Sequence, residues 1–377
     1  MASSYWLSEA AWSPPPPRAR EGRVDVAIVG GGVTGCACAR VLAEAGLRVR
    51  VHEAREIASG ASGRNGGFAL RGGAPAYDVA REELGRDRAE ALWRLTEHYL
   101  DRLAELAGDA FRRTGSLRLA ADPNERAELQ AEHEALREDG FAVEWREELN
   151  EPLGRLFPGA IFHPPDGALQ PARWVRRLAA RAAEAGAELH ENSPVESLDE
   201  LEADQVVVAT DGYTAGLVPA LDAAVVPTRG QVIVTEPLER RVFPCPHYAR
   251  HGYDYWQQTP DGRLVTGGFR DKALELENTA EEATTPLIQQ HLETFVAELL
   301  GDLPRITHRW AGIFGTTQDR LPLVGRLPGR DDVWVSVGYS GHGNVMGLAC
   351  GELVARAILG EVAPELELFD PARLVAA

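Results

Sequence analysis

Glycines and one carboxylate at a regular spacing form the most informative stretch of the sequence. An apolar run, Val24–Val29, leads into GGGVTG at residues 30–35, which matches the pattern G-x-G-x-x-G. Glu53 follows roughly 20 residues later, as in dinucleotide-binding proteins. Gly30 permits a sharp turn, Gly32 permits close approach of a pyrophosphate, and Gly35 permits tight packing of a helix. The stretch therefore predicts a dinucleotide site, with Glu53 accepting hydrogen bonds from a ribose.

Two further glycine-rich segments carry polar side chains that suit phosphates or a ring system. The segment at residues 59–67 reads SGASGRNGG and directly follows the predicted ribose carboxylate. The segment at residues 338–344 reads GYSGHGN and lies between a predicted strand at 332–337 and a predicted helix at 345–359. A helix N-terminus offers free N–H groups and a partial positive charge, so this second loop is another place where negative charge is stabilised.

Secondary-structure signals around these segments predict two domains of mixed class, α/β and α+β. The βαβ pattern of residues 24–53 resumes with a helix at 172–185 and strands at 188–190 and 204–209. Between these parts we expect a helix over 77–106, a strand over 111–120 and a helix from Pro123. Antiparallel strands follow over 225–269, with a turn at 260–262, then a helix over 286–300 and a strand over 310–317.

This order predicts a discontinuous nucleotide-binding domain and a substrate domain built on an antiparallel sheet with helices. The nucleotide-binding domain comprises residues 1–75, 165–222 and 310–377, and the substrate domain comprises residues 76–164 and 223–309. Aromatic side chains gather on one predicted strand of the substrate domain, at Tyr253, Tyr255 and Trp256. They form either a cage around a substrate or core packing between sheet and helix, and the sequence leaves both open.

Composition narrows the class of protein. The chain has 377 residues and a formal net charge of −18, which argues against nucleic acid and anionic membrane as partners. Its four cysteines have no metal-like spacing and predict free thiols in a reducing cytoplasm. No apolar run approaches the roughly 18 residues of a membrane span. A proline run at residues 14–17 predicts an extended N-terminal arm that Tyr5 and Trp6 pin to the body.

Together these motifs resemble a known family. The series GGGVTG, GASGRNGG, VVVATDGYT, TPDGRLVTGG, TTQDRLPLVG and GYSGHGNVMGLACGE is similar to the flavin-dependent amine and amino-acid oxidases of the D-amino-acid oxidase type. The start SYWL and the segment GASGRNGG resemble the branch of gamma-glutamylputrescine oxidase-like proteins. The resemblance covers nearly the whole chain and implies FAD, a glutathione-reductase-type nucleotide domain, and an antiparallel sheet that carries the substrate site.

The resemblance also implies roles for individual positions. The glycine motif with Val33 and Thr34 lies at the pyrophosphate, and Glu53 with Ala54 lies at the adenosine ribose. Val195 contacts the adenine through its backbone. The remaining positions implied to contact FAD are Ala61, Ser62, Gly63, Arg64, Asn65, Gly66, Gly67, Ala209, Thr210, Gly338, Tyr339, Gly341, His342 and Gly343. Among these, residues 341–343 place N–H groups near the flavin N1–O2 edge, where they stabilise the anionic reduced ring.

Two departures from the family pattern bear on the cofactor and the substrate. Sarcosine oxidases attach FAD through a cysteine, and Gly312 stands at that place, so we expect non-covalent FAD. Glycine oxidases hold the substrate carboxylate with an arginine, and Phe314 stands there. We therefore expect a pocket of Tyr255, Trp256, Arg270 and Phe314 that favours amines, or amines whose carboxylate is remote. Arg270 or Arg320 could instead supply the missing charge.

The expected reaction is oxidation of a C–N bond, with hydride transfer to flavin N5, hydrolysis of the imine and reoxidation by oxygen. It requires no acid–base side chain, and none is assigned. An amino-acid oxidase, or a dehydrogenase that uses another acceptor, is the first alternative. A flavin monooxygenase is more remote, because Gly108-Asp109-Ala110 has that family's letters in an early position. A disulfide reductase would need a second glycine motif and a redox cysteine pair, and neither is visible in the sequence. A flavoprotein that only docks partners is the non-catalytic alternative.

Overall fold

The predicted βαβ unit lies at the centre of a six-stranded sheet in the computed structural model, which describes residues 3–14 and 22–375. In this unit β1 (Val24–Val29) pairs in parallel with β2 (Val49–His52), and α2 (Val33–Glu44) connects them. The strand order is β16-β17-β10-β1-β2-β9, and only the edge strand β16 is antiparallel to its neighbour. The other members are β9 (Glu188–His190), β10 (Ala203–Val208), β16 (Leu323–Leu327) and β17 (Arg330–Val337).

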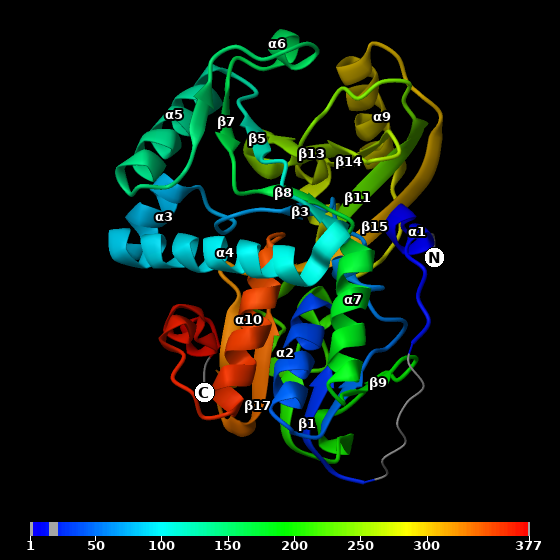
Figure 1. Ribbon diagram of the computed structural model, residues 1–377, viewed down its shortest axis with the longest axis vertical. Coiled ribbons are helices and arrows are strands. Elements are labelled where there is room, and N and C mark those ends of the chain that lie inside the picture. Colours follow the sequence, from blue (N-terminus) through cyan, green and yellow to red (C-terminus); the bar gives the residue numbers. More distant parts are fainter. Residues whose placement is uncertain (1–2, 15–21, 376–377) are drawn as a thin grey trace.

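Three helices cover one face of this sheet, in the lower half of Figure 1. They are α2, α7 (Pro171–Glu184) and α10 (Gly343–Ile358), and α2 packs against both of the others. The long helix α4 (Arg86–Ala107) packs on α7 and α10 and crosses the middle of the molecule, as Figure 1 shows. The parallel sheet is thereby buried under helices, and its strands are apolar and closely packed.

The upper half of the molecule is built on an eight-stranded sheet, in the order β15-β11-β14-β13-β12-β5-β7-β6. Neighbours are antiparallel except β12 and β5. Its strands are β5 (Ser116–Leu119), β6 (Glu144–Arg146), β7 (Ala160–His163), β11 (Val226–Pro237), β12 (His247–Ala249), β13 (Asp254–Gln258), β14 (Arg263–Gly268) and β15 (Ile306–Thr316). A small antiparallel sheet contains β3 (Phe68–Ala69), β4 (Phe111–Arg112) and β8 (Gly167–Leu169).

The remaining helices are α1 (Tyr5–Glu9), α3 (Tyr77–Leu84), α5 (Pro123–Glu138), α6 (Leu153–Leu156), α8 (Leu274–Glu277) and α9 (Pro286–Leu300). α5 begins at Pro123 as predicted, and the carboxylate of Asp122 caps it. α1 is attached to the body, because the indole N–H of Trp6 donates to the carbonyl of Asn65 at 2.8 Å. Of the predicted proline arm only Pro14 is described, and residues 15–17 lie outside the described residues.

Two predicted elements differ from the structure, and one strand runs across a predicted domain boundary. The helix expected over 77–106 is broken at Gly85, whose φ of 85° and ψ of 150° lie outside the helical region. The strand expected over 111–120 is two strands of different sheets, separated by Gly115 at φ 71°. The domain boundary expected at residue 310 falls inside β15, which pairs with β11 along its length and so belongs to the eight-stranded sheet.

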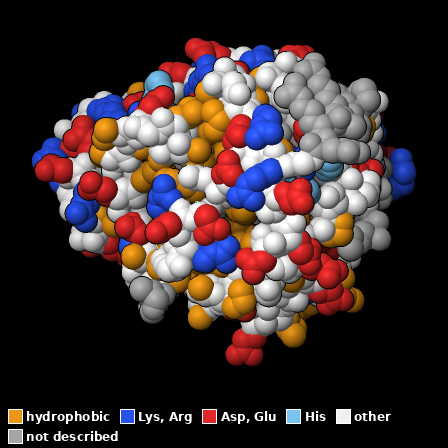
Figure 2. All heavy atoms as spheres, turned by 90° about the horizontal axis from the view of Figure 1, so that it is seen from below, with side chains coloured by type: hydrophobic (Ala, Val, Ile, Leu, Met, Phe, Trp, Pro, Cys, Tyr) orange, Lys and Arg blue, Asp and Glu red, His pale blue; other side chains and the backbone are white. Residues whose placement is uncertain are grey.

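The surface carries both signs of charge. Figure 2 shows Lys and Arg side chains interspersed with Asp and Glu on the face seen from below. All four cysteines are free and buried, and the described residues contain no cluster of His, Cys, Asp or Glu with the geometry of a metal site. Within residues 3–14 and 22–375, no helix has the length and apolar character needed to cross a membrane.

Candidate functional site

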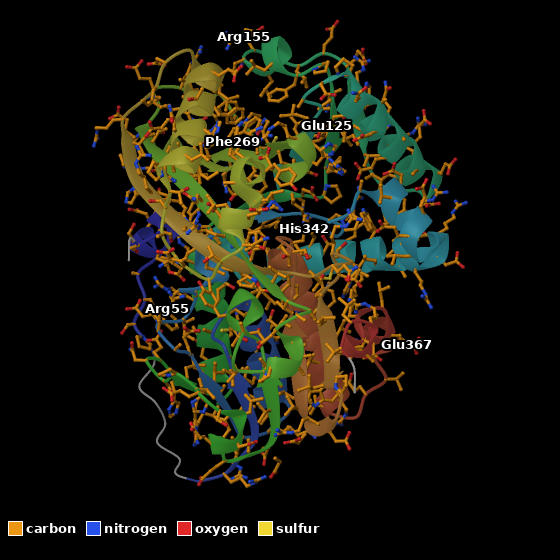
Figure 3. The ribbon with its side chains drawn as sticks, turned by 180° about the vertical axis from the view of Figure 1, so that it is seen from behind. Arg55, Glu125, Arg155, Phe269, His342 and Glu367 are labelled. Carbon is orange, nitrogen blue, oxygen red and sulfur yellow. The ribbon has the colours of Figure 1, made fainter. Side chains whose placement is uncertain are left out.

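A single cavity of about 1080 Å³ extends from the N-terminus of α2 to the eight-stranded sheet. Its volume is slightly above the range typical of pockets for drug-sized molecules. Both large sheets contribute to its lining, together with the loops at residues 59–67 and 338–344. His342 lies near the centre of the molecule between the two halves, as Figure 3 shows.

The glycine motif forms one end of the cavity. Gly30 has φ of 112°, and a Cβ there would lie 2.5 Å from the carbonyl oxygen of Ala209. A Cβ on Gly35 would lie 2.0 Å from the carbonyl oxygen of Gly30, so the start of α2 packs too closely for any side chain. Gly32 lies at the cavity surface, where a Cβ would meet the hydroxyl oxygen of Ser62 at 2.8 Å. The motif thus presents backbone at a helix N-terminus, which is an arrangement suited to phosphate.

Glu53 follows β2 directly and lines the same end of the cavity. One carboxylate oxygen accepts the N–H of Gly31 at 2.8 Å, and the other accepts the N–H of Arg55 at 2.9 Å. The carboxylate therefore links the glycine motif to the loop that follows β2. An ionised carboxylate has about four lone-pair positions, so these two bonds leave acceptor capacity for a hydroxyl group.

The loop at residues 59–67 wraps along the cavity and is held by its own polar groups. Ser62 accepts the N–H of Val33 at 3.1 Å, and the amide of Asn65 donates to the carbonyls of Ala61 and Ser62. The guanidinium of Arg64 donates to the carbonyls of Ser59 and Ala311, at 2.7 and 3.1 Å. The Arg64 side chain thus joins the loop to β15, which the sequence did not indicate.

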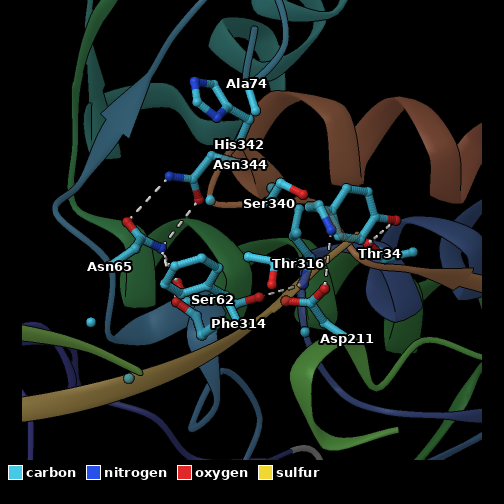
Figure 4. Close-up of a pocket in the computed structure, with 18 of the residues that line it drawn as sticks. Thr34, Ser62, Asn65, Ala74, Asp211, Phe314, Thr316, Ser340, His342 and Asn344 are labelled. Atoms are coloured by element: carbon cyan, nitrogen blue, oxygen red, sulfur yellow. Dashed lines mark hydrogen bonds between the residues drawn. The ribbon is translucent and has the colours of Figure 1, made fainter. Parts of the chain in front are cut away.

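The loop at residues 338–344 is anchored by a half-buried carboxylate, that of Asp211, as Figure 4 shows. Asp211 accepts the N–H groups of Gly315, Gly338 and Tyr339 at 3.0, 2.9 and 3.3 Å. Burial raises the pKa of Asp211, and these three N–H groups oppose the rise because they stabilise the carboxylate. One carboxylate therefore fixes the end of β15 against the loop that begins α10.

Asn65 and Asn344 connect the two polar loops across the cavity. The Asn344 amide donates to the side-chain oxygen of Asn65 at 3.2 Å and to the carbonyl of Phe68 at 2.7 Å. His342 lies beside this pair, and burial lowers its pKa to about 4. Its imidazole is therefore neutral at physiological pH, and positive charge at this loop comes from backbone N–H groups rather than from the ring.

Aromatic residues from the eight-stranded sheet form the other end of the cavity. Tyr255 on β13 and Phe314 on β15 line it, together with Arg270, which follows β14. Burial raises the pKa of Tyr255 to about 12. The phenol is therefore protonated at physiological pH and can donate a hydrogen bond.

Trp256 does not line this cavity, which corrects its prediction as a pocket residue. It is fully buried on the other face of the sheet, where its ring stacks on His247 and meets Phe295 of α9 edge-on. Neighbouring residues of a strand point to opposite faces, and α9 covers the face that Trp256 occupies. The predicted aromatic group therefore divides into two cavity residues, Tyr253 and Tyr255, and one core residue, Trp256.

The structure brings most of the predicted site residues to one cavity. Those that line it are Gly30, Gly32, Val33, Thr34, Glu53, Ala54, Ala61, Ser62, Arg64, Asn65, Gly66, Val195, Ala209, Thr210, Tyr255, Arg270, Phe314, Tyr339, Gly341, His342 and Gly343. Gly35, Gly63, Gly67 and Gly338 lie behind the lining, and each is a close-packed position that excludes a side chain. These four glycines contribute to the site through the shape that they give to its loops.

Sequence reasoning missed a polar cluster that links distant segments at the cavity. Glu282, in the loop before α9, pairs with Arg55 at 2.8 Å and with Arg64 at 3.5 Å, and it accepts the hydroxyl of Tyr213. Nothing in the spacing around Glu282 marks it as a site residue. Asp211 and Asn344 were within quoted motifs, but their side-chain partners depend on tertiary contacts.

The residues present fit FAD. The cavity presents a backbone cradle at Gly32, a carboxylate at Glu53 and a second glycine loop at a helix N-terminus. A Cβ at position 312 would lie 2.9 Å from the Cβ of Arg64, so a side chain there would be crowded. None of the four cysteines lines the cavity.

Comparison with known proteins identifies proteins that are similar to this chain in sequence and in structure. A family model described as FAD dependent oxidoreductase matches residues 25–357. The gamma-glutamylputrescine oxidoreductase of Escherichia coli (strain K12) is 30% identical over 92% of this chain and 85% of its own length. The probable oxidoreductase OrdL of Rhizobium meliloti (strain 1021) is 30% identical over 94% and 87%. A crystal structure of glycine oxidase from Geobacillus kaustophilus superposes with a TM-score of 0.78 at 25% identity, covering 94% of this chain and 100% of that chain.

Proposed function

Because the chain belongs to the family of FAD-dependent oxidoreductases, close to amine and amino-acid oxidases, we propose that it oxidises the C–N bond of a small amine. The cofactor is FAD, bound without a covalent link in the cavity of about 1080 Å³. One observation carries the proposal: this cavity joins the cradle at Gly32 to the aromatic end at Tyr255 and Phe314.

Each end of the cavity has a distinct part in binding. Gly32 and the N-terminus of α2 would hold the pyrophosphate, and Glu53 would hold the adenosine ribose. The backbone N–H groups of residues 341–343 would stabilise the negative charge that develops on the reduced ring. Tyr255 and Phe314 position the substrate and exclude water from it.

When bound, FAD would supply the two-electron oxidant for the carbon next to the amine nitrogen, which would lose a hydride, and water would hydrolyse the resulting imine. The chain needs to supply position, a dry pocket and a neutral amine. The aromatic walls at Tyr255 and Phe314 serve the first two tasks, since they displace water and present apolar surfaces to the substrate. Molecular oxygen is the proposed electron acceptor.

The test begins with the colour of the purified protein. We expect a yellow protein whose flavin stays in the supernatant after acid precipitation, as a non-covalent cofactor does. Anaerobic mixing with a panel of amines and amino acids should then bleach the flavin band with at least one compound. Readmitted air should restore the band and produce peroxide.

Two outcomes would count against this function. Colour that remains in the acid pellet would mean a covalent flavin. A yellow protein that no amine or amino acid bleaches would point to a different reaction or to a docking role. Bleaching without reoxidation by air would retain C–N oxidation but replace oxygen with another acceptor.

A further inference from the structure

Arginines line the cavity from several elements, and in the described part of the chain all but one have a carboxylate partner. The pairs are Arg55 and Arg64 with Glu282, Arg71 with Glu97, Arg118 with Glu132, and Arg320 with Glu83. Arg270 is the exception, because it forms no ion pair with any described residue. Among the arginines that line the cavity, Arg270 is therefore the one whose charge no described carboxylate compensates.

The acids nearest to Arg270 along the chain are committed elsewhere. Asp271 pairs with Arg250 at 2.8 Å and with Lys272 at 3.2 Å. Asp254, on the neighbouring strand, pairs with Arg250 at 2.5 Å. These ion pairs form away from the cavity, so they give Arg270 no counter-charge.

Arg270 is held between aromatic rings. Its guanidinium carbon lies 4.5 Å from the ring centre of Tyr253 and 5.7 Å from that of Phe314. Aromatic faces stabilise a guanidinium through their π-electrons and leave its N–H edge free for hydrogen bonds in the plane. The charge of Arg270 also opposes the rise in the pKa of Tyr255, so the Tyr255 phenol lies within its field.

The backbone before Arg270 adopts an unusual conformation. Gly268 has φ of 130°, and a Cβ there would lie 1.9 Å from the carbonyl oxygen of Tyr253. Phe269 has φ of 62°, in the left-handed region that non-glycine residues rarely adopt. The Phe269 ring is buried against His291 and Phe295. This turn directs Phe269 into the core and leaves the next side chain at the cavity.

We propose that Arg270 binds a carboxylate of the substrate, so that the oxidised amine belongs to an amino acid or another amino carboxylate. The proposal rests on the proposed function and names its substrate class. A half-buried cation without a partner favours an anionic ligand, and a guanidinium pairs with a carboxylate through two parallel hydrogen bonds. The expectation from Phe314 that plain amines are preferred is thereby revised, because the charge comes from another element.

The test measures binding rather than turnover. The flavin absorbance of the holoenzyme is titrated with acetate, propionate, butyrate and benzoate, and with the matching neutral amides. We expect saturable spectral changes with at least one acid, and binding of its amide that is weaker by about 30-fold or more, because the amide cannot form the charge-assisted pair. Absence of binding by every acid would overturn the proposal.

Variants test whether Arg270 is the arginine that binds the acid. Arg270→Gln should remove the preference for acid over amide, and Arg270→Lys should retain part of it, since the charge remains but the planar fork is lost. Lys272→Gln, which removes an equal charge two residues away and outside the cavity, is the matched control and should bind like the wild type. Wild-type acid binding in Arg270→Gln, or loss of binding in Arg320→Gln alone, would overturn the assignment.

If Arg270→Gln does not retain flavin, Arg270→Lys decides, because an unchanged acid affinity in that variant would contradict bidentate binding. The titration also separates the two proposals. Arg270-dependent binding of acids together with no bleaching by any amine or amino acid would reject C–N oxidation and keep the anion site. Bleaching by an amine or amino acid, together with acid binding that does not depend on Arg270, would keep C–N oxidation and reject the anion site at Arg270.

Discussion

Among single residues, Glu53 should matter most for retention of the cofactor. Its carboxylate accepts two backbone N–H groups and, in our proposal, the ribose hydroxyls. Glu53→Ala removes a charged acceptor, which costs about 1.5–3 kcal/mol. We therefore expect FAD affinity to fall by roughly 10- to 100-fold, measured by quenching of FAD fluorescence on titration of the apoprotein.

Glu56→Ala provides the matched control for this variant. Glu56 is three residues away, its side chain is 64% exposed, and it does not line the cavity. It should bind FAD like the wild type. A Glu53→Ala protein that purifies with a full complement of flavin would show that the ribose lies elsewhere.

Among the elements, the loop at residues 338–344 depends on Gly341, whose backbone conformation is strained for any other residue. Gly341 has φ of 90° and lines the cavity, where a Cβ would face the ring of Phe314 at 3.8 Å. Gly341→Ala should therefore cost about 1–2 kcal/mol of stability and also slow flavin reduction, measured by stopped-flow absorbance. His342→Ala should have a smaller effect on reduction, because the ring is neutral and the backbone carries the role.

Gly360→Ala separates strain from function in this comparison. Gly360 has φ of 83°, a Cβ there would have no other atom within 4 Å, and it follows α10 far from the cavity lining. Gly360→Ala should lower the unfolding midpoint about as much as Gly341→Ala does, but it should leave flavin reduction unchanged. A larger loss of reduction in His342→Ala than in Gly341→Ala would make the imidazole a chemical participant.

For the whole molecule, buried histidines predict a loss of stability in mild acid. Burial lowers the pKa of His247 to about 3, against 6.5 for a free histidine. Between these values the unfolded chain binds a proton that the folded chain does not, so stability falls as pH decreases below 6.5. The loss is roughly 2 kcal/mol at pH 5. Asp166 acts in the opposite direction, because burial raises its pKa to about 6.

His247→Phe isolates this effect from the other titrating groups. The imidazole stacks on Trp256 with ring centres 5.4 Å apart, and a phenyl ring can occupy the same space without binding a proton. The thermal midpoint of the holoenzyme, measured at constant excess FAD from pH 7.5 to pH 5, should fall less steeply for the variant than for the wild type. Parallel curves would show that folding does not lower the pKa of His247.

Local patterns in the sequence determined the βαβ unit and most element positions. Strand, glycine turn and helix are neighbours in the chain, so the residues that specify them also contact one another. Where contacts are distant, local patterns were not sufficient. The strand predicted over 111–120 was wrong, because Gly115 divides it between two sheets, and β15, which contains the predicted domain boundary, pairs with β11. Strand pairing depends on which partner buries an apolar face, and this information is not local.

The sequence also indicated many of the residues that gather at the cavity, because three glycine-rich segments each precede or follow a strand end. The tertiary structure alone decided the substrate end of the cavity. α9 covers one face of the eight-stranded sheet, so Trp256 enters the core and Tyr255 reaches the cavity. Glu83 pairs with Arg320, while no described acid reaches Arg270. Whether an arginine is neutralised depends on carboxylates that the fold brings from distant positions, and spacing along the chain does not contain that information.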